Sequence, residues 1–209
     1  MYSDITGIIL SGGKSKRMKE NKSFLKLGDK YIIEIISELM KSLFKNVILI
    51  TNDVSDYKFL KLESYSDLYK EKGPLGGIHS GLLNSITDNN FIISCDMPLI
   101  SKEIIEFIIN YNSDKLIKVP IADGFIQQLC GLYNKECISS AEMILKESYF
   151  EKRNDIQAKR KCNVLKLLDI SGAEIIDIEN EYSNYEKYTF MNMNTPEEYK
   201  FISENIWKR

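Results

Sequence analysis

The sequence predicts an α/β domain in which helices cover both faces of a mainly parallel sheet. In the first half of the chain, apolar runs typical of buried strands alternate with amphipathic helical patterns, which indicates a parallel sheet. Polar residues or glycines follow three of these runs, and ligands bind outside the carboxyl ends of the strands in such sheets. With 209 residues, 44% of them apolar, and no repeat or linker, the chain is expected to form one domain.

The first half contains three predicted strands and two predicted helices. The strands are residues 5–10, 47–51 and 91–94, each a short apolar run. A helix over residues 31–44 is predicted from one apolar face, which comprises Ile32, Ile35, Ile36, Leu39 and Leu43. Ser101 is expected to cap a second helix, whose inward residues are Ile104, Ile105, Ile108 and Ile109.

The second half is less regular. Residues 116–120 and 128–133 are predicted strands around a turn at Asp123-Gly124, and residues 174–178 are a late strand. Helices are expected over residues 138–145 and 157–168. The segment Thr195-Pro196-Glu197-Glu198 is typical of a helix start, because threonine caps, proline suits the first position and Glu198 can close a capping box.

Composition and charge argue against several classes of protein. A net charge of −2 does not suit a general nucleic-acid binder, no segment has the length of a membrane span, and the N-terminus lacks a signal-peptide pattern. The single histidine, His79, is expected to be structural. The cysteines form no C-x-x-C pair and are typical of reduced thiols in a cytoplasmic protein; they are Cys95, Cys130, Cys137 and Cys162.

Residues 11–18 (SGGKSKRM) have the composition of a phosphate-binding loop. The adjacent glycines Gly12 and Gly13 allow backbone N–H groups to approach an anion closely. Four cations can neutralise a polyphosphate, namely Lys14, Lys16, Arg17 and Lys22. The P-loop motif does not fit, because it requires glycine where the chain has Ile8. A nucleoside-triphosphate site is therefore favoured, and an ordinary turn with surface lysines is the alternative.

Residues 7–18 (GIILSGGKSKRM), followed by Asn21-Lys22 and Leu25, resemble the opening of the molybdenum cofactor guanylyltransferases. The family form is LAGG-x-x-x-R-M-G followed by D-K, from which Ser11, Lys19 and Asn21 depart. The resemblance implies a single three-layer, Rossmann-like domain with a mixed, mainly parallel sheet, similar to the nucleotide-diphospho-sugar transferases. It also implies catalytic roles for Arg17 and Lys22, and nucleotide contacts by Leu10, Ser11, Gly12, Gly13 and Lys22.

Asp96 is the candidate metal ligand. A carboxylate at a strand end can hold Mg²⁺, which needs only one or two protein carboxylates when phosphates and water fill its other positions. From the residues alone, a solvated turn aspartate explains Asp96 equally well. Cys95-Asp96-Met97-Pro98 resembles the family's C-D-x-P element, which implies that Asp96 binds Mg²⁺ and nucleotide and takes part in catalysis.

Residues 73–82 (GPLGGIHSGL) resemble a second family signature, G-P-L-A-G-x-x-x-G-L, with Gly76 in place of alanine. Gly76 leaves room for a flat ring beside a helix start. Asp67 lies six residues before Gly73, as in the family's D-x-x-x-x-x-G-P-L spacing, and its carboxylate can accept the paired N–H donors of guanine. Ribose binding or a turn cap is the alternative for Asp67. Asn52 is a further candidate for nucleotide contact, although asparagine is also a common turn residue.

Residues 190–198 (FMNMNTPEE) resemble the family's F-x-N-x-N-T-P-E-E, whose asparagines lie on the acceptor side. In an extended segment, Asn192 and Asn194 would point the same way, and a helix cap explains Thr195 but not both asparagines. Residues 128–133 resemble the family's P-L-C-x-L-Y, with Gln128 in the proline position. Residues 1–110 are thus expected to bind GTP and magnesium, and residues 111–209 the acceptor.

The resemblance implies a magnesium-dependent transfer of GMP from GTP to the phosphate of a molybdopterin cofactor, which releases pyrophosphate and forms the guanine dinucleotide cofactor. Positioning and charge neutralisation dominate such chemistry. Cofactor-synthesis proteins or molybdoenzymes are the expected protein partners, without nucleic acid or membrane. Three alternatives remain: a cytidylyltransferase, whose loop typically reads L-A-A-G, a transferase for another small phosphate, and a GTP-binding homologue without catalysis.

Overall fold

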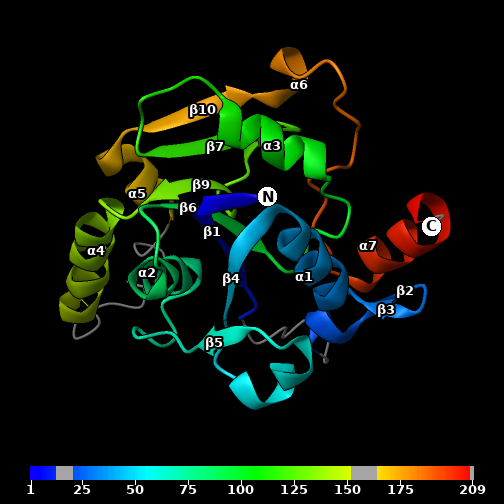
Figure 1. The fold of residues 1–209 in the computed structure, drawn as a ribbon, viewed down its shortest axis with the longest axis horizontal. Helices are drawn as coiled ribbons and strands as arrows, with labels where there is room; N and C mark the ends of the chain where they lie inside the picture. Colours follow the sequence, from blue (N-terminus) through cyan, green and yellow to red (C-terminus); the bar gives the residue numbers. More distant parts are fainter. Residues whose placement is uncertain (13–20, 152–163, 208–209) are drawn as a thin grey trace.

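The computed structural model describes residues 1–12, 21–151 and 164–207, with residues 149–151 described by their backbone alone. Their centre is one sheet in the order β10-β7-β9-β6-β1-β4-β5, with β8 beside β7 (Figure 1). The strands are β1 (Tyr2–Leu10), β4 (Phe44–Ile50), β5 (Glu63–Tyr65), β6 (Asn89–Ser94), β7 (Ile117–Ala122), β8 (Phe125–Ile126), β9 (Cys130–Asn134) and β10 (Ala173–Asp177). The predicted strands are therefore present, most with small shifts at their ends.

The sheet is mixed and mainly parallel, as expected. Strand β1 is parallel to β4 and β6, β4 is parallel to β5, and β7 is parallel to β10. Strand β9 runs antiparallel to both of its neighbours, β6 and β7. Strand β9 lies between β6, from the first half of the chain, and β7, from the second half. The strand direction therefore reverses where the two halves of the chain meet in the sheet.

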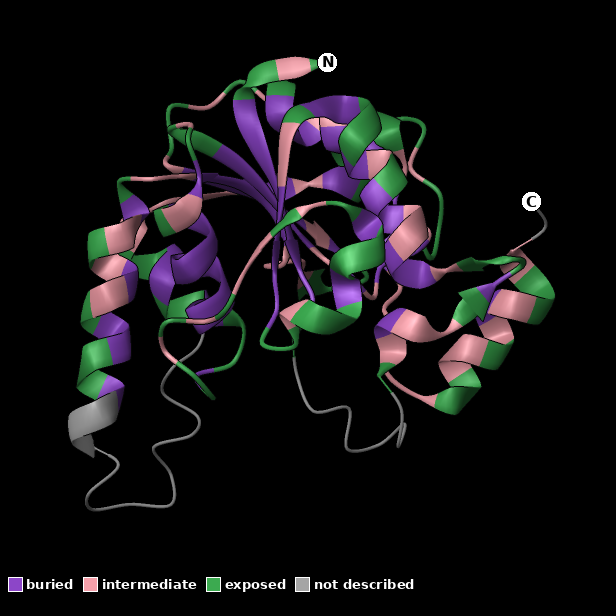
Figure 2. Cartoon of the chain, turned by 60° about the horizontal axis from the view of Figure 1, so that its bottom comes forward, coloured by how far each residue is buried: buried purple, intermediate pink, exposed green. Residues whose placement is uncertain are grey.

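Helices cover both faces of the sheet. Successive side chains of a strand point to opposite faces, and in the central strands the side chains on both faces are apolar. Ile5 and Ile9 of β1 belong to one core cluster, with α1 (Ile32–Leu43), α3 (Lys102–Asn110) and α6 (Ile178–Glu181). Ile8 and Leu10 belong to the other, with α2 (Pro74–Asn84), α4 (Cys137–Glu151) and α5 (Val164–Ser171). In Figure 2, buried positions (purple) cover the central strands and the helix faces that pack on them. The predicted three-layer fold is confirmed.

A third, smaller cluster joins the C-terminal segment to a short hairpin of β2 (Lys26–Leu27) and β3 (Lys30–Tyr31). Helix α7 (Pro196–Phe201) continues as the π-helical turn η4 (Ile202–Ile206), and both lie beside this hairpin (Figure 1). The helix begins as predicted, since the Thr195 side chain accepts from the backbone N–H of Glu198 and the Glu198 carboxylate accepts from that of Thr195. This packing holds residues 190–195 near the sheet.

Several sequence expectations need correction. Helix α1 buries Ile33 and Met40, whereas Ile35 and Leu39 are only partly buried, because the face that meets the sheet is rotated from the predicted one. Strand β9 begins at Cys130, because a turn follows the extra strand β8 and includes Gln128. Residues 157–163 of one predicted helix lie outside the described residues, and α5 covers 164–171. Within the described part of the chain, no helix is both long and apolar enough to cross a membrane.

Candidate functional site

Four parallel strands end side by side at one edge of the sheet. Leu10 of β1 pairs with Ile50 of β4 and with Ser94 of β6, and Ile50 pairs with Tyr65 of β5. The residues that lie two positions beyond these strand ends are four of the predicted site residues: Gly12, Asn52, Asp67 and Asp96. The sheet register therefore brings together residues that are far apart in the sequence. Gly13 and Arg17, which were also predicted, lie outside the described residues.

Asp67 and Asn52 form a reciprocal pair. The Asn52 amide donates to Asp67 Oδ2, and the backbone N–H of Asp67 donates to Asn52 Oδ1, both at 3.2 Å. Burial raises the pKa of the Asp67 carboxyl, and the hydrogen bond from Asn52 opposes that shift. A hydrogen bond of 2.9 Å from the backbone N–H of Leu68 to Ser80 Oγ attaches this segment to α2. Asp67 is thus a partly buried acceptor in a fixed position.

Gly76 permits a close approach between α2 and the segment that carries Asp67. A Cβ atom at Gly76 would lie 2.9 Å from the carbonyl oxygen of Tyr69, which is closer than such atoms approach. The alanine of the family signature would therefore meet the Tyr69 carbonyl oxygen in this chain. At Gly77, a Cβ atom would meet Leu10 Cδ2 at 3.3 Å and Asp67 Oδ1 at 3.7 Å, so Leu10 and Asp67 lie together beside α2.

The predicted nucleotide contacts at the end of β1 differ in how accessible they are. Gly12 is exposed, and a Cβ atom there would meet nothing within 4 Å. Ser11 is only 3% exposed, its backbone N–H donates to the Ile50 carbonyl at 2.9 Å, and its hydroxyl donates to the Tyr57 hydroxyl at 2.8 Å. The side chain and the N–H of Ser11 therefore make hydrogen bonds inside the protein. Its carbonyl oxygen is left for any contact with a nucleotide.

Asp96 is half-buried in the turn after β6. Its Oδ1 accepts from Ser94 Oγ at 2.6 Å, and its carbonyl accepts from the backbone N–H of Met193 at 3.0 Å. Among the described residues, no cluster of three His, Cys, Asp or Glu could hold a metal ion. A single carboxylate nevertheless fits Mg²⁺ that is bound together with phosphates and water, because that ion needs one or two protein carboxylates.

Lys22 links the two predicted sides of the site. It lies in η1 (Lys22–Phe24), and its Nζ donates to Asn194 Oδ1 at 2.6 Å. Asn192 has a different environment, because it lines a cavity that Asn194 does not reach. An extended segment would point both asparagines the same way toward a ligand. In the structure they do not share one direction.

The cavity beside Asn192 has a volume of about 510 Å³ and begins next to Asp96, since Met97 lines it. Gln128 and Glu198 contribute polar groups, and Phe125 and Tyr188 contribute aromatic rings. Gln128 Oε1 is buried and has no hydrogen-bond partner among the residues that the structure describes. The combination of rings and polar side chains is suited to a flat molecule that carries hydrogen-bonding groups.

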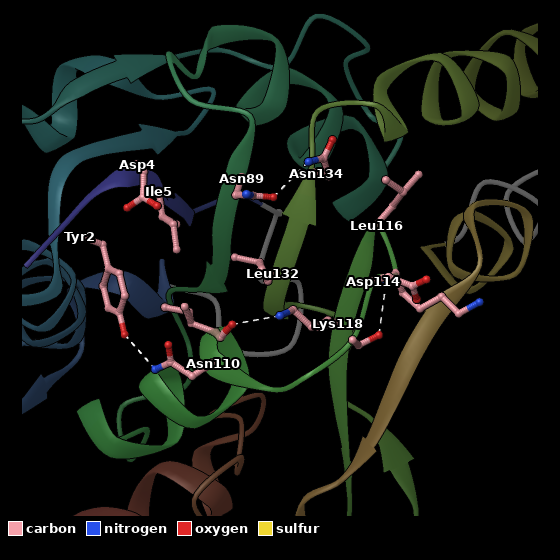
Figure 3. A pocket seen from close by; sticks show the side chains of 13 residues that line it. Tyr2, Asp4, Ile5, Asn89, Asn110, Asp114, Leu116, Lys118, Leu132 and Asn134 are labelled. Atoms are coloured by element: carbon pink, nitrogen blue, oxygen red, sulfur yellow. Dashed lines mark hydrogen bonds between the residues drawn. The ribbon is translucent and has the colours of Figure 1, made fainter.

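A second cavity, of about 410 Å³, lies at the opposite edge of the sheet, where β1 and β6 begin (Figure 3). Two pairs of its polar side chains are bonded to each other: Asn110 donates to the Tyr2 hydroxyl at 3.1 Å and Asn134 donates to Asn89 at 3.0 Å. It contains none of the predicted site residues. His79 is buried against the edge of the Tyr69 ring, and burial lowers its pKa, which agrees with the structural role expected for it.

Three polar residues at the carboxyl edge were not predicted from the sequence: Ser94, which donates to Asp96, and Ser23 and Tyr57, which bond to Ser11. The position of Ser94, two residues before Asp96, was the one available signal, because alternate residues of a strand face the same way. Tyr57 lies in η2 (Val54–Leu60), whose sequence gives no sign that its hydroxyl reaches β1.

The covered, mainly parallel sheet and the polar residues gathered at the carboxyl ends of its strands define an α/β domain with a candidate ligand site at that edge. Comparison with known families then places the protein: the chain belongs to the family of MobA-like NTP transferase domains, whose sequence model matches residues 7–160. The resemblance inferred from the sequence motifs is thereby confirmed.

Relatives cover nearly the whole chain. A probable molybdenum cofactor guanylyltransferase of Clostridium perfringens is 33% identical over 92% of each chain, and one of Carboxydothermus hydrogenoformans is 31% identical over 94% of each chain. Among solved structures, molybdopterin-guanine dinucleotide biosynthesis protein A of Archaeoglobus fulgidus has a TM-score of 0.77 at 20% identity, covering 95% of this chain and 97% of its own. That likeness supports the fold.

Proposed function

We propose that this nucleotidyltransferase moves GMP from GTP to the phosphate of a molybdopterin cofactor, releasing pyrophosphate. The observation that carries the proposal is the shared position of Gly12, Asn52, Asp67 and Asp96 just beyond paired strand ends. The names of the relatives support the choice of substrates. The buried, free thiols of Cys95, Cys130 and Cys137 support a cytoplasmic location.

In this proposal, residues 1–110 bind the nucleotide. Asp67 accepts the two N–H donors of guanine, while Asn52 holds the carboxylate in place and Leu10 packs beside it. Gly12 and Gly13 offer backbone N–H groups to the phosphates. Arg17 and Lys22 neutralise the triphosphate and the charge that develops as pyrophosphate leaves. Gly76 acts through the close approach of α2 to the segment that contains Asp67.

Asp96 is proposed to hold Mg²⁺ together with the phosphates. The ion would supply positive charge to the α- and β-phosphate oxygens. Ser94 orients the Asp96 carboxylate through the 2.6 Å hydrogen bond to Oδ1, which leaves Oδ2 for a ligand. The chain itself thus contributes a fixed carboxylate at the sheet edge where the nucleotide residues lie.

Residues 111–209 are proposed to bind the acceptor. Asn192 lines the 510 Å³ cavity, and Asn194 holds Lys22 through the 2.6 Å hydrogen bond from its Nζ. The acceptor phosphate is already ionised at neutral pH and needs no general base, so the work of the chain is to place it in line with the α-phosphate of GTP.

A nucleotide panel with two matched variants tests this function. Wild-type protein with Mg²⁺ and molybdopterin should release pyrophosphate from GTP, and GTP should bind more tightly than CTP, ATP or UTP. Asp67→Ala should remove most of the preference for GTP, because losing one partner of a charged, partly buried hydrogen bond costs about 1–3 kcal/mol. Equal affinities in the wild type, or a preference for CTP, would refute the guanylyl assignment.

Asp96→Asn keeps the size of the side chain and removes its charge. We expect it to fold normally and to release pyrophosphate at least a hundredfold more slowly, on the order of the loss of a charged ligand in phosphoryl transfer. The control is Asp114→Asn, since Asp114 is exposed at the opposite edge of the sheet. A folded Asp96→Asn protein with a normal rate would show that Asp96 holds no essential metal.

A further inference from the structure

A hydrogen-bond network lies next to the end of β1, formed by Ser11, Asn21, Ser23 and Tyr57 (the Tyr57 network). The Tyr57 hydroxyl accepts from Ser11 Oγ at 2.8 Å and from Asn21 Nδ2 at 2.9 Å, and it donates to Ser23 Oγ at 3.0 Å. Ser23 Oγ in turn donates to Asn21 Oδ1 at 2.9 Å. Tyr57 is 1% exposed and its bonds to Ser11 and Ser23 are buried, whereas Asn21 is exposed and its bond to Tyr57 is partly buried.

The Tyr57 hydroxyl has no spare capacity. A phenol carries one proton and two lone pairs, and the three neighbours use all of them. Removing the hydroxyl leaves the Asn21 amide without this acceptor, whereas the Ser11 hydroxyl can still bond to Ser23 at 2.8 Å. Asn21 is therefore the group that depends most on Tyr57.

Asn21 controls the placement of Lys22. It is the N-cap of η1, where its Oδ1 accepts from the backbone N–H of Ser23 at 3.2 Å. The Tyr57 ring also stacks on Phe24 of the same short helix, with ring centroids 5.1 Å apart. The ring and the hydroxyl of Tyr57 thus both hold the element from which Lys22 reaches Asn194.

We propose that Tyr57 is a positioning residue for the nucleotide site. One hydroxyl accepts hydrogen bonds from Ser11, directly after β1, and from Asn21, directly before Lys22, and so fixes where Lys22 lies relative to the end of β1. This inference rests on the proposed function, because Lys22 is taken to contact the triphosphate.

The network also explains two departures from the family form together. Alanine at position 11 would have no hydroxyl to donate to Tyr57. Aspartate at position 21 would have no N–H to donate, and its carboxylate would instead compete with Ser23 for the Tyr57 proton. Ser11 and Asn21 therefore both fit the Tyr57 hydroxyl as hydrogen-bond donors.

The test is Tyr57→Phe, which keeps the ring on Phe24 and removes only the hydroxyl. We expect the Kd and KM for GTP to rise about tenfold, the size of one lost hydrogen bond, while the KM for the molybdopterin acceptor stays unchanged. Tyr65→Phe is the control, because the Tyr65 hydroxyl bonds to Glu63 on the edge strand β5. A partly unfolded protein would lower kcat and leave both KM values unchanged, and this result would refute the positioning role.

A double-mutant cycle gives a second, independent readout. If Tyr57 acts through Asn21, the double variant Tyr57→Phe/Asn21→Ala should bind GTP no more weakly than Asn21→Ala alone. Multiplication of the two single effects would refute the inference. A wild-type protein that neither binds GTP nor releases pyrophosphate would instead refute the proposed function, so the two failures are distinguishable.

Discussion

Alanine at position 76 would restore the residue of the family signature, yet we expect Gly76→Ala to destabilise this protein. Its Cβ atom would lie 2.9 Å from the Tyr69 carbonyl oxygen, and ordinary contact begins at 3.4 Å, so this backbone must move by about 0.5 Å. Such overpacking costs about 1–3 kcal/mol. Alanine regains at most about 1 kcal/mol through its higher helix propensity. The net expectation is a loss of about 1 kcal/mol in the free energy of unfolding.

Gly77→Ala is the matched control for this prediction. Its Cβ atom would meet Leu10 Cδ2 at 3.3 Å, and the end of a flexible side chain can move where a backbone carbonyl cannot. Urea unfolding should therefore place Gly76→Ala below both wild type and Gly77→Ala. The affinity of Gly76→Ala for GTP should fall as well, because Asp67 lies two residues before the displaced Tyr69. The reasoning fails if Gly76→Ala equals Gly77→Ala in stability and binds GTP like the wild type.

Three further predictions concern titratable groups. Because burial raises the pKa of Asp67 and Asn52 opposes it, GTP affinity should begin to fall at a higher pH than for an ordinary aspartate, and Asn52→Ala should move that midpoint up in pH-dependent binding isotherms. Burial and the charge of Asp96 raise the pKa of Cys95 to about 11, so alkylation followed by mass spectrometry should find Cys95 unmodified in native protein at pH 8. Burial lowers the pKa of His79, so its contribution should reduce stability as the pH falls below 6.5, and His79→Phe should remove that part of the pH dependence of urea unfolding.

The sequence predicted those parts of the fold that depend on periodic burial. The predicted inward face of α3 is correct, because this helix packs on the sheet through a single row of apolar side chains: Ile104, Ile105, Ile108 and Ile109. In α1 the predicted face is correct at Ile32, Ile36 and Leu43 but misses Ile33 and Met40. This helix contacts two clusters, since Ile33 packs against the sheet and Ile35 toward the hairpin of β2 and β3. One apolar periodicity cannot separate two contact surfaces.

The positions of candidate site residues were predictable where the residues directly follow strands. The direction of a side chain, toward the protein interior or toward a ligand, was less predictable. Register alone accounts for the gathering of Asn52, Asp67 and Asp96. The inward direction of the Ser11 hydroxyl depends on Tyr57, which is 46 residues away and has no motif around it. Asn194 likewise contacts Lys22 across 172 residues, a pairing that no local pattern could indicate.

The reversed strand β9 explains how the second half of the chain reaches the nucleotide edge. The predicted site residues at this edge follow β1, β4, β5 and β6, because these strands are parallel. In β9 the pairing of Cys130 with Ile93 and the 2.9 Å hydrogen bond from the Ser94 N–H to the Leu129 carbonyl put the start of the strand next to the end of β6. A parallel β9 of five residues would carry Leu129 about 16 Å away, to the opposite edge. The reversal therefore places the cavity lined by Gln128 and Met97 next to Asp96, which is the position that the proposed in-line attack requires for an acceptor phosphate.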